Sequence, residues 1–259
     1  MPSTLICFAL KEEAAPFRKI VVGKSGILIL LTGIGRQNAE KSLREFFTNP
    51  FRGAHAARVL RRAARPPDNT RIEPIRSARE PRALPKLVLT CGFAGGLNPE
   101  LKLGDVVFEI SRSRGDETQI IEKSESSYVV SYEKLIAAGA KPAKIFCAGR
   151  IATTVAEKKK LRAQTGADAV EMESAAIHAI CRERKIPCIM VRVISDTANE
   201  DLPLDFNALA KPDKNLDFGK LFLAIAKSPG KIPALMQLQK KTKFAAEQLA
   251  EVLAKVILP

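Results

Sequence analysis

Carboxylic acids stand at three points where the chain is expected to pass from one structural element to the next. Glu12 and Glu13 follow an apolar segment, Glu171 and Glu173 precede a helical one, and Asp196 follows another apolar segment. Singly, an acid at a helix start ordinarily interacts with the helix dipole, and an acid in a loop is ordinarily solvated. Together, carboxyl groups at one edge of a sheet can act as general acids and bases. Their joint placement therefore favours a catalytic site.

Glycines accompany these acids. Gly33 and Gly35 come just before a segment of helical composition, and Gly92, Gly95 and Gly96 follow another apolar segment. Glycine lets the backbone turn tightly and leaves amide groups open at a helix start, where an anion or a ribose oxygen can bind. The same residues also make ordinary turns, so they favour a binding site without defining one.

The elements that must position these residues alternate along the chain. Apolar segments predict buried strands, and Gly-Lys-Ser-Gly between two of them predicts a hairpin. The expected strands are 4–10, 20–22, 27–31, 86–90, 106–110, 145–148 and 188–194, and the expected helices are 36–47, 157–164 and 172–184. The alternation predicts an α/β fold with three layers, a mostly parallel or mixed sheet flanked by helices. Ligands bind such sheets at the carboxyl ends of the strands, where loops 11–13, 91–96 and 195–199 would meet.

The composition is that of a globular chain, with 46% hydrophobic and 27% charged residues among 259. Five cysteines form no C-x-x-C pair, which favours buried thiols in a reducing compartment. The two histidines, His55 and His178, lie far apart, so no zinc site is expected. The apolar runs are shorter than the roughly 18 residues of a membrane span, and we expect a cytoplasmic protein without a metal or cofactor.

Residues 48–85 differ in character from the rest of the chain. The stretch from Arg52 to Arg82 holds nine of the 42 basic residues and three of the 28 acidic ones, so much of the net charge of +14 is local. Irregular segments of this length are usually functional or disordered. We expect a tolerated surface insertion, with an arm for nucleic acid or a partner as the alternative.

Residues 216–259 are expected to form a helical extension of a domain that spans residues 1–215. Apolar residues recur there at three-, four- and seven-residue steps, and lysines occupy the other faces. The apolar residues are Leu235, Leu238, Ala245, Leu249, Val252 and Val256. The stripe favours packing on the domain or on a second subunit. Weak contact with a membrane surface is the alternative.

Four segments, in this order, carry a family likeness. They read LTGIGRQNA at residues 31–39, TCGFAGGLNPELKLGDVV at 90–107, AVEMESAAI at 169–177 and VRVISDTA at 191–198. They resemble the nucleoside phosphorylase/nucleosidase superfamily, above all its methylthioadenosine/S-adenosylhomocysteine nucleosidase branch. The segment SPGKIPALMQL at 228–238 is similar to the C-terminus of the hopanoid-associated members. The likeness implies cleavage of the bond between base and ribose in a purine nucleoside, and a homodimer or larger homo-oligomer.

The resemblance also implies a role for each acid. Asp196 corresponds to the general acid that protonates or hydrogen-bonds N7 of the purine, and Glu173 to the residue that holds the ribose hydroxyls. Met172 corresponds to the side chain beneath the sugar, and Glu13 to the carboxylate that orients the attacking water. Further substrate-binding residues are expected to be Phe93, Gly95, Gly33, Ser195 and Arg150.

These roles agree with the chemistry of the bond. Its cleavage builds positive charge on the ribose, which a carboxylate stabilises, and negative charge on the base, which an acid neutralises. An aspartic acid donates a proton near neutral pH only in a dry or negatively charged setting. Val191, Val193 and Ile194 favour a dry setting for Asp196, whereas Arg192, on the same face of the strand, would oppose donation if it lay close.

The segment after the first strand bears on the choice between water and phosphate. The phosphorylases that the chain resembles carry G-D-P-x-R there, whose arginine holds phosphate, whereas this chain reads ALKEEAAPFR. Glu13 would repel a phosphate dianion and suits a bound water, which favours hydrolysis. Phosphorolysis remains the alternative, with phosphate held by Arg36, Arg150 or Arg192. A second alternative is a non-catalytic protein that binds nucleosides or nucleic acid, but the intact acid clusters argue against it, and nucleic acid is not an expected partner.

Two departures from the nucleosidase pattern bear on which nucleoside is the substrate. Phe93 stands where a small residue is common, and residues 148–151 lack the aromatic side chain that stacks on adenine. These departures argue against recognition of adenine and of a small methylthio group as the nucleosidases achieve it. The expected substrate is a small-molecule nucleoside, a 5′-substituted adenosine with a large apolar 5′ group, and the base stays open.

Overall fold

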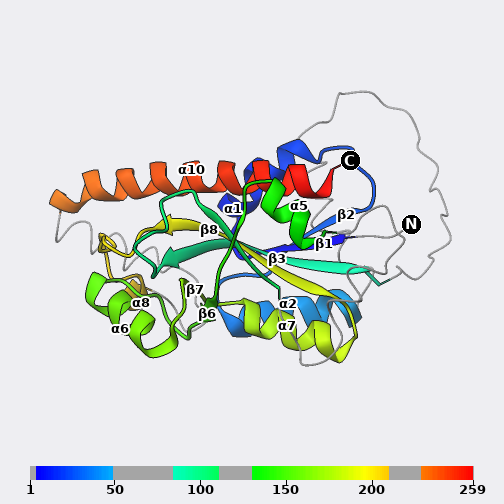
Figure 1. The fold of residues 1–259 in the computed structure, drawn as a ribbon, viewed down its shortest axis with the longest axis horizontal. Coiled ribbons are helices and arrows are strands. Elements are labelled where there is room, and N and C mark those ends of the chain that lie inside the picture. The colour runs from blue at the N-terminus through cyan, green and yellow to red at the C-terminus, as the bar shows by residue number, and fades with distance from the viewer. Residues whose placement is uncertain (1–3, 49–83, 111–129, 210–228, 259) are drawn as a thin grey trace, which may run out of the picture.

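The computed structural model describes residues 4–48, 84–110, 130–209 and 229–258. The predicted insertion, apart from its two ends, and the first residues of the predicted tail lie outside these described residues. A sheet stands between two layers of helices (Figure 1). The predicted three-layer α/β architecture is confirmed.

Strands and helices alternate through most of the described chain. The strands are β1 (Thr4–Phe8), β2 (Ile27–Leu31), β3 (Leu87–Gly96), β4 (Val106–Ile110), β5 (Lys141–Pro142), β6 (Ile145–Cys147), β7 (Ala169–Glu171) and β8 (Cys188–Asp196). The helices are α1 (Lys11–Ile20), α2 (Arg36–Thr48), α5 (Tyr132–Ala137), α6 (Val155–Thr165), α7 (Ser174–Glu183), α8 (Phe206–Leu209) and α10 (Ile232–Ile257), with the short 3-10 helix η1 (Pro229–Lys231) before α10.

The sheet is mixed, with a parallel centre. Its strands follow the order β2-β1-β3-β8-β4-β5, and β7 pairs with β3 and with β6. The four strands β2, β1, β3 and β8 are parallel, whereas β4 runs antiparallel to β8 and β7 antiparallel to β3. The carboxyl ends of β1, β2, β3 and β8 therefore gather at one end of the molecule.

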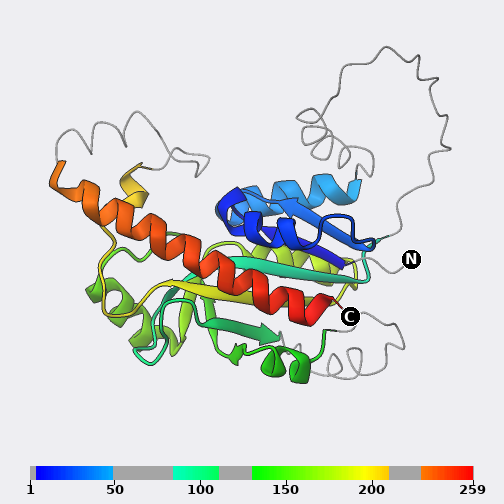
Figure 2. The same cartoon turned by 90° about the horizontal axis from the view of Figure 1, so that it is seen from above.

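Alternate side chains of the parallel strands pack on opposite layers. Ile6 and Phe8 of β1 belong to a core that includes residues of α1, α5 and α10, while Leu5 and Cys7 belong to one that includes residues of α2 and α7. Figure 2 shows α10 and α1 together on one side of the sheet. Burial on both faces explains why these strands are apolar throughout.

The long helix α10 crosses one face of the sheet. Of its predicted apolar stripe, Ala245, Leu249, Val252 and Val256 are buried in the core against α1 and β8, so this half of the stripe packs on the domain. Leu235 and Leu238, the rest of the predicted stripe, are partly buried, and Met236 between them is exposed. Among the described residues, no helix has the length and apolar character needed to cross a membrane.

Two local predictions are wrong. The hairpin expected around residues 23–26 does not form, because residues 11–20 are the helix α1 and β2 lies parallel to β1. Gly23 and Gly26, both with positive φ, make the turn from α1 into β2 instead. The segments 11–13 and 91–96, expected as loops, are the first turn of α1 and the second half of β3.

Candidate active site

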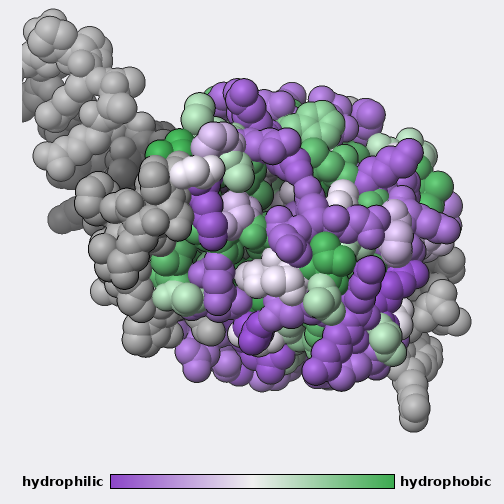
Figure 3. Space-filling model, turned by 90° about the vertical axis from the view of Figure 1, so that its left-hand side faces the viewer, coloured by the Kyte–Doolittle hydropathy of each residue, from purple (hydrophilic) through white to green (hydrophobic). Residues whose placement is uncertain are grey.

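Three acids predicted from the sequence lie at the end of the molecule where the parallel strands terminate. Glu13 follows β1, Asp196 is the last residue of β8, and Glu173 is the N-cap of α7, just after β7. All three are buried. Hydrophilic side chains cover most of this end, with hydrophobic ones between them (Figure 3). The strand β3, between β1 and β8, connects the acids, since Phe93 contacts Glu13 and Gly95 lies beside Asp196.

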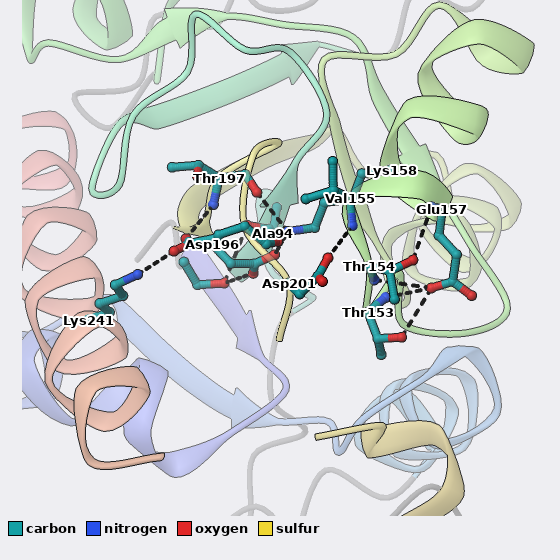
Figure 4. Close-up of polar contacts among 12 residues, drawn as sticks. Ala94, Thr153, Thr154, Val155, Glu157, Lys158, Asp196, Thr197, Asp201 and Lys241 are labelled. Carbon is teal, nitrogen blue, oxygen red and sulfur yellow. Dashed lines mark hydrogen bonds and ion pairs between the residues drawn. The ribbon is translucent and has the colours of Figure 1, made fainter. Parts of the chain in front are cut away.

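Asp196 has a polar partner on each carboxylate oxygen. Its Oδ1 accepts a hydrogen bond from the Ser195 hydroxyl at 2.8 Å, and its Oδ2 lies 2.6 Å from Nζ of Lys158 (Figure 4). A Cβ atom at Gly95 would lie 3.2 Å from Oδ2, so glycine leaves room for the carboxylate there. Asp196 is therefore held in one orientation, by a lysine that the sequence analysis did not single out.

Glu13 is fixed by two backbone amides. Its Oε2 accepts a hydrogen bond from the amide of Leu10, the N-cap residue of α1, and its Oε1 accepts one from the amide of Phe93, both at 2.9 Å. Burial raises the pKa of Glu13, and the two amide donors oppose that rise. Phe93 thus contributes its backbone, and each carboxylate oxygen keeps a lone pair for a further donor.

Glu173 is linked to the glycine-rich turn after β2. Its Oε1 accepts a hydrogen bond from the amide of Gly35 at 2.7 Å. Gly33, with a φ of +81°, makes the turn. The amide that donates to the carboxylate of Glu173 is that of Gly35, not that of Gly33. Burial, followed by repulsion from Glu171, raises the pKa of Glu173 to about 7.

Glu171 has the opposite electrostatic setting. Burial would raise its pKa, but the Arg192 guanidinium and hydrogen bonds from Ser174 and from the amide of Glu173 hold it at about 2. Nη2 of Arg192 lies 2.7 Å from Oε2 of Glu171 and donates to the Thr90 hydroxyl at 2.9 Å. The hypothesis that Arg192 interacts with Asp196 or holds phosphate therefore loses its support, because its guanidinium is buried and paired with Glu171.

A cavity of about 780 Å³ lies next to the turn at Gly35, and Glu13, Glu173 and Asp196 are not among the residues that line it. Met172, Gly35 and Arg150 line it, and Glu173 approaches it through its hydrogen bond with Gly35. Basic side chains at its wall are those of Arg36, Arg150 and Lys160, and Arg150 forms an ion pair with Glu157. The volume is in the range of small-molecule sites.

Lys158 and Glu171 are the main residues that sequence reasoning missed as contributors to the site. Lys158 stands in the run Lys158-Lys159-Lys160, which is typical of a solvated helix face. One signal was present, because Lys158 falls between Val155 and Leu161 at helical spacing and so interrupts the inward face of α6. Glu171 was noted in the acid cluster, but its partner Arg192 is distant in sequence.

Comparisons with known proteins place part of the chain near one family. The family model of the phosphorylase superfamily matches residues 143–226. An aminodeoxyfutalosine nucleosidase of Campylobacter jejuni is 32% identical over 138 residues, which cover 46% of this chain and 60% of that protein. A 5′-methylthioadenosine/S-adenosylhomocysteine nucleosidase of Shewanella halifaxensis is 29% identical over 143 residues, covering 48% of this chain and 62% of that protein. The aligned part thus spans about three fifths of these relatives.

A solved structure extends the likeness to the whole fold. The futalosine hydrolase of Helicobacter pylori strain 26695 superposes with a TM-score of 0.56 at 17% identity, covering 98% of this chain and 97% of that chain. The matched segment 143–226 contains both Glu173 and Asp196. Residues 143–226 thus match the phosphorylase superfamily, the aligned part of the chain is distantly similar in sequence to aminodeoxyfutalosine and methylthioadenosine/S-adenosylhomocysteine nucleosidases, and the fold is similar to that of a futalosine hydrolase.

Proposed function

We propose that this chain is a cytoplasmic nucleosidase that uses water to cleave the N-glycosidic bond of a purine nucleoside, a 5′-substituted adenosine. The observation that carries the proposal is the convergence of three buried carboxyl groups, those of Glu13, Glu173 and Asp196, from three different elements. Burial of carboxylates is unfavourable unless they are paired or hydrogen-bonded, as all three are here. Such an arrangement suits a reaction in which opposite charges develop on two parts of one substrate.

Asp196 serves the departing base. As the bond between C1′ of the ribose and N9 of the base breaks, its electron pair goes to the base, and N7 takes the proton of the Asp196 carboxyl. Ser195 supports this step, because its hydroxyl contacts Oδ1 of Asp196. The contact with Lys158 orients the same carboxyl group, although a cation this close opposes the protonated form that donates.

Glu173 and Met172 serve the ribose. A carboxylate at Glu173 accepts hydrogen bonds from ribose hydroxyls and stabilises the positive charge on the sugar ring. Met172 lines the cavity next to it and offers an apolar surface to the sugar. The hydrogen bond from Gly35 holds one oxygen of Glu173 and leaves the other for the substrate.

Glu13 serves the attacking water. Two backbone amides fix its carboxylate, so a water that donates to a remaining lone pair is held in a defined position. When water attacks C1′, its oxygen bonds to the sugar and one of its protons passes to Glu13. The product is then a free sugar.

Phosphorolysis is the second candidate, and the cavity is the observation in its favour. Arg36 and Lys160 line it, and within the described part of the chain no carboxylate lies in ion-pair distance of either. An unpaired basic wall favours an anion, which in a phosphorylase is the nucleophile. Glu13 argues against phosphate at the reacting carbon itself.

The cavity also bears on the substrate. Phe146, Ile151 and Leu161 give its wall an apolar surface. This surface supports a nucleoside with a large 5′ substituent. The homo-oligomer is proposed on the family likeness, and sedimentation velocity measures it.

One experiment tests the function and separates the two candidates. The purified chain is incubated with adenosine, methylthioadenosine and adenosines with longer 5′ substituents, each with and without phosphate, and the sugar product is identified. Hydrolysis predicts free sugar at the same rate in both conditions. A sugar 1-phosphate that forms only with phosphate establishes the second candidate, and unchanged nucleosides in all tubes refute both.

A further inference from the structure

Lys158 is a completely buried lysine whose ammonium group meets three oxygen atoms. Its Nζ donates hydrogen bonds to the carbonyl oxygens of Thr197 at 2.7 Å and Glu200 at 2.9 Å, and lies 2.6 Å from Oδ2 of Asp196 (Figure 4). An ammonium group has three N–H donors, so every donor has an acceptor. Lysines are almost never fully buried unless they are paired in this way.

Stability alone is a weak explanation for this lysine. A buried ion pair can often be replaced by apolar side chains of similar size without loss of stability, because desolvation offsets the attraction between the charges. The two lysines that follow, Lys159 and Lys160, are exposed. The side chain of Lys158 is thus directed at one carboxyl group, which is the one assigned to the departing base.

The ammonium group contacts Oδ2 of Asp196, and the hydrogen-bond partner of the other oxygen, Oδ1, can change. The Ser195 hydroxyl, at 2.8 Å from Oδ1, also has the carbonyl oxygen of Ala94 within 3.4 Å. Because a hydroxyl has one proton, Ser195 can turn to Ala94 when a substrate base approaches Oδ1. The same ammonium group holds the backbone of residues 197–200, which follow Asp196 directly.

We propose that Lys158 is a positioning residue for Asp196, which fixes Oδ2, presents Oδ1 to the base and pairs with the carboxylate that forms when the proton leaves. This inference rests on the proposed role of Asp196. Loss of the proton to N7 leaves a carboxylate, and the ammonium group at 2.6 Å stabilises it where water is excluded. The geometry matters as well as the charge, since three donors meet three acceptors.

Other charged groups near this pair are few and mutually balanced. Glu200 accepts a hydrogen bond from the amide of Thr197 at 2.7 Å, and its other carboxylate oxygen pairs with Lys241 of α10. From β3, the neighbour of Asp196 is Gly95, which has no charge. Lys158 is therefore the cation in direct contact with Asp196 among the described residues.

The test compares Lys158→Met and Lys158→Arg with Lys159→Met, an exposed control on the same helix, using methylthioadenosine or the best substrate of the panel. We expect kcat of Lys158→Met to fall on the order of 10²-fold, with a much smaller change in KM. Arginine keeps the charge but has a planar group that cannot meet the same three oxygens, so kcat of Lys158→Arg should also fall. Lys159→Met should match the parent protein.

The pH profile of kcat/KM separates positioning from a purely structural role. Asp196→Asn identifies the limb of the profile that belongs to Asp196, because this limb disappears in that variant. Removing a neighbouring cation makes a carboxylate easier to protonate, so the limb should move to higher pH in Lys158→Met. It should stay in place in Lys158→Arg, which keeps the positive charge.

The outcomes are distinct. A folded Lys158→Met variant with parental kcat and an unmoved limb overturns the inference, while the proposed function stands. Should Lys158→Met fail to fold, parental kcat in Lys158→Arg overturns it, because the three-acceptor geometry then has no effect. Full activity of Asp196→Asn removes Asp196 from the reaction, and both the role of Asp196 and the inference fail.

Discussion

Nη2 of Arg192 lies 2.7 Å from Oε2 of Glu171, and at most 1% of the surface of either side chain is exposed. The pair joins the middle of β8 to the end of β7, at the point where the chain turns toward Glu173. The carboxylate of Glu171 thus lies next to Glu173, and the guanidinium of Arg192, from the central sheet, neutralises its charge. Glu171 and Glu173 are two residues apart, yet their pKa values lie at about 2 and about 7.

Replacing Arg192 by methionine should destabilise the protein strongly. The variant leaves the Glu171 carboxylate buried without its cation, a change that ordinarily costs about 3–5 kcal/mol. The free energy of unfolding in urea measures the loss. Arg44, whose pair with Glu183 is exposed, is the matched control, and Arg44→Met should leave the unfolding midpoint nearly unchanged. Equal effects of the two substitutions would contradict a special role for the buried pair.

Glu173 should make the stability depend on pH. Its pKa of about 7 in the fold lies above the ordinary 4.5, so the folded chain holds this proton more tightly than the unfolded chain does. The free energy of unfolding should therefore fall as the pH rises from about 4.5 to about 7, by up to roughly 3 kcal/mol. Glu173→Gln, which resembles the protonated form, should lack this part of the fall. Urea unfolding of both proteins at pH 5 and pH 8 measures the difference, and a pH-independent difference would refute the prediction.

Asp196→Asn should lower kcat by about 10²–10⁴-fold, because the amide keeps the shape of the side chain but supplies no acidic proton. The variant should still fold, with a lower unfolding midpoint, since Lys158 then lies buried beside a neutral group. Initial rates of nucleoside cleavage and circular dichroism measure the two effects. Asp205→Asn, at an exposed loop position, is the control. A parental kcat in Asp196→Asn would exclude the residue from the mechanism.

Gly92→Ala should disturb Glu13. A Cβ atom at this position would lie 2.8 Å from Oε1 and 3.0 Å from Oε2 of Glu13, and Gly92 has a φ of +152°. We expect kcat to fall on the order of tenfold or more, and Glu13→Gln to slow the reaction without a large rise in KM. Gly230→Ala, where a Cβ atom meets no other atom within 4 Å, is the control. If Gly92→Ala is fully active, Glu13 does not need its observed position.

Deletion of residues 52–82 should leave most of the activity and stability. The described chain stops at the end of α2, at Thr48, and resumes shortly before Leu87, which pairs with Thr4 at the start of β1. Long surface segments change the entropy of a fold only slightly when they are shortened. Rates of cleavage and urea unfolding of the deletion variant test this. Loss of folding or of nucleoside binding would show that the segment belongs to the site.

Local sequence patterns predicted much of the fold. The strand β8 and the helix α2 are close to their predicted bounds, because a continuous apolar segment and a polar segment of helical composition leave few alternatives. The hairpin failed because Lys11–Ile20 prefers a capped helix, and glycines that suit a two-strand turn also suit a turn from a helix into a strand. In the same way, Gly92, Gly95 and Gly96 were expected in a loop but continue β3.

The site was less accessible to sequence reasoning. The sequence points to Glu173 and Asp196 through the family-like segments around them, and to Glu13 through its place after the first strand. The partners of two acids were not found, because Lys158 lies in a lysine run and the pairing of Arg192 with Glu171 depends on how β7 meets the sheet. Lys158 and Arg192 pair with acids of the site because both are buried. Burial of a charged residue depends on contacts with residues distant in the chain, which local patterns do not show.

The parallel centre of the sheet divides the molecule into two ends with different freedom to vary. The acids stand where β1 and β8 terminate, whereas the chain passes into residues 49–83 after α2, and into residues 111–129 after Ile110, which pairs with Ile189 near the start of β8. The points where the described chain enters these two segments are separated from the acids by the length of the sheet. Evolution and protein engineering can therefore lengthen, trim or label this end of the molecule while the positions of the reacting groups stay fixed.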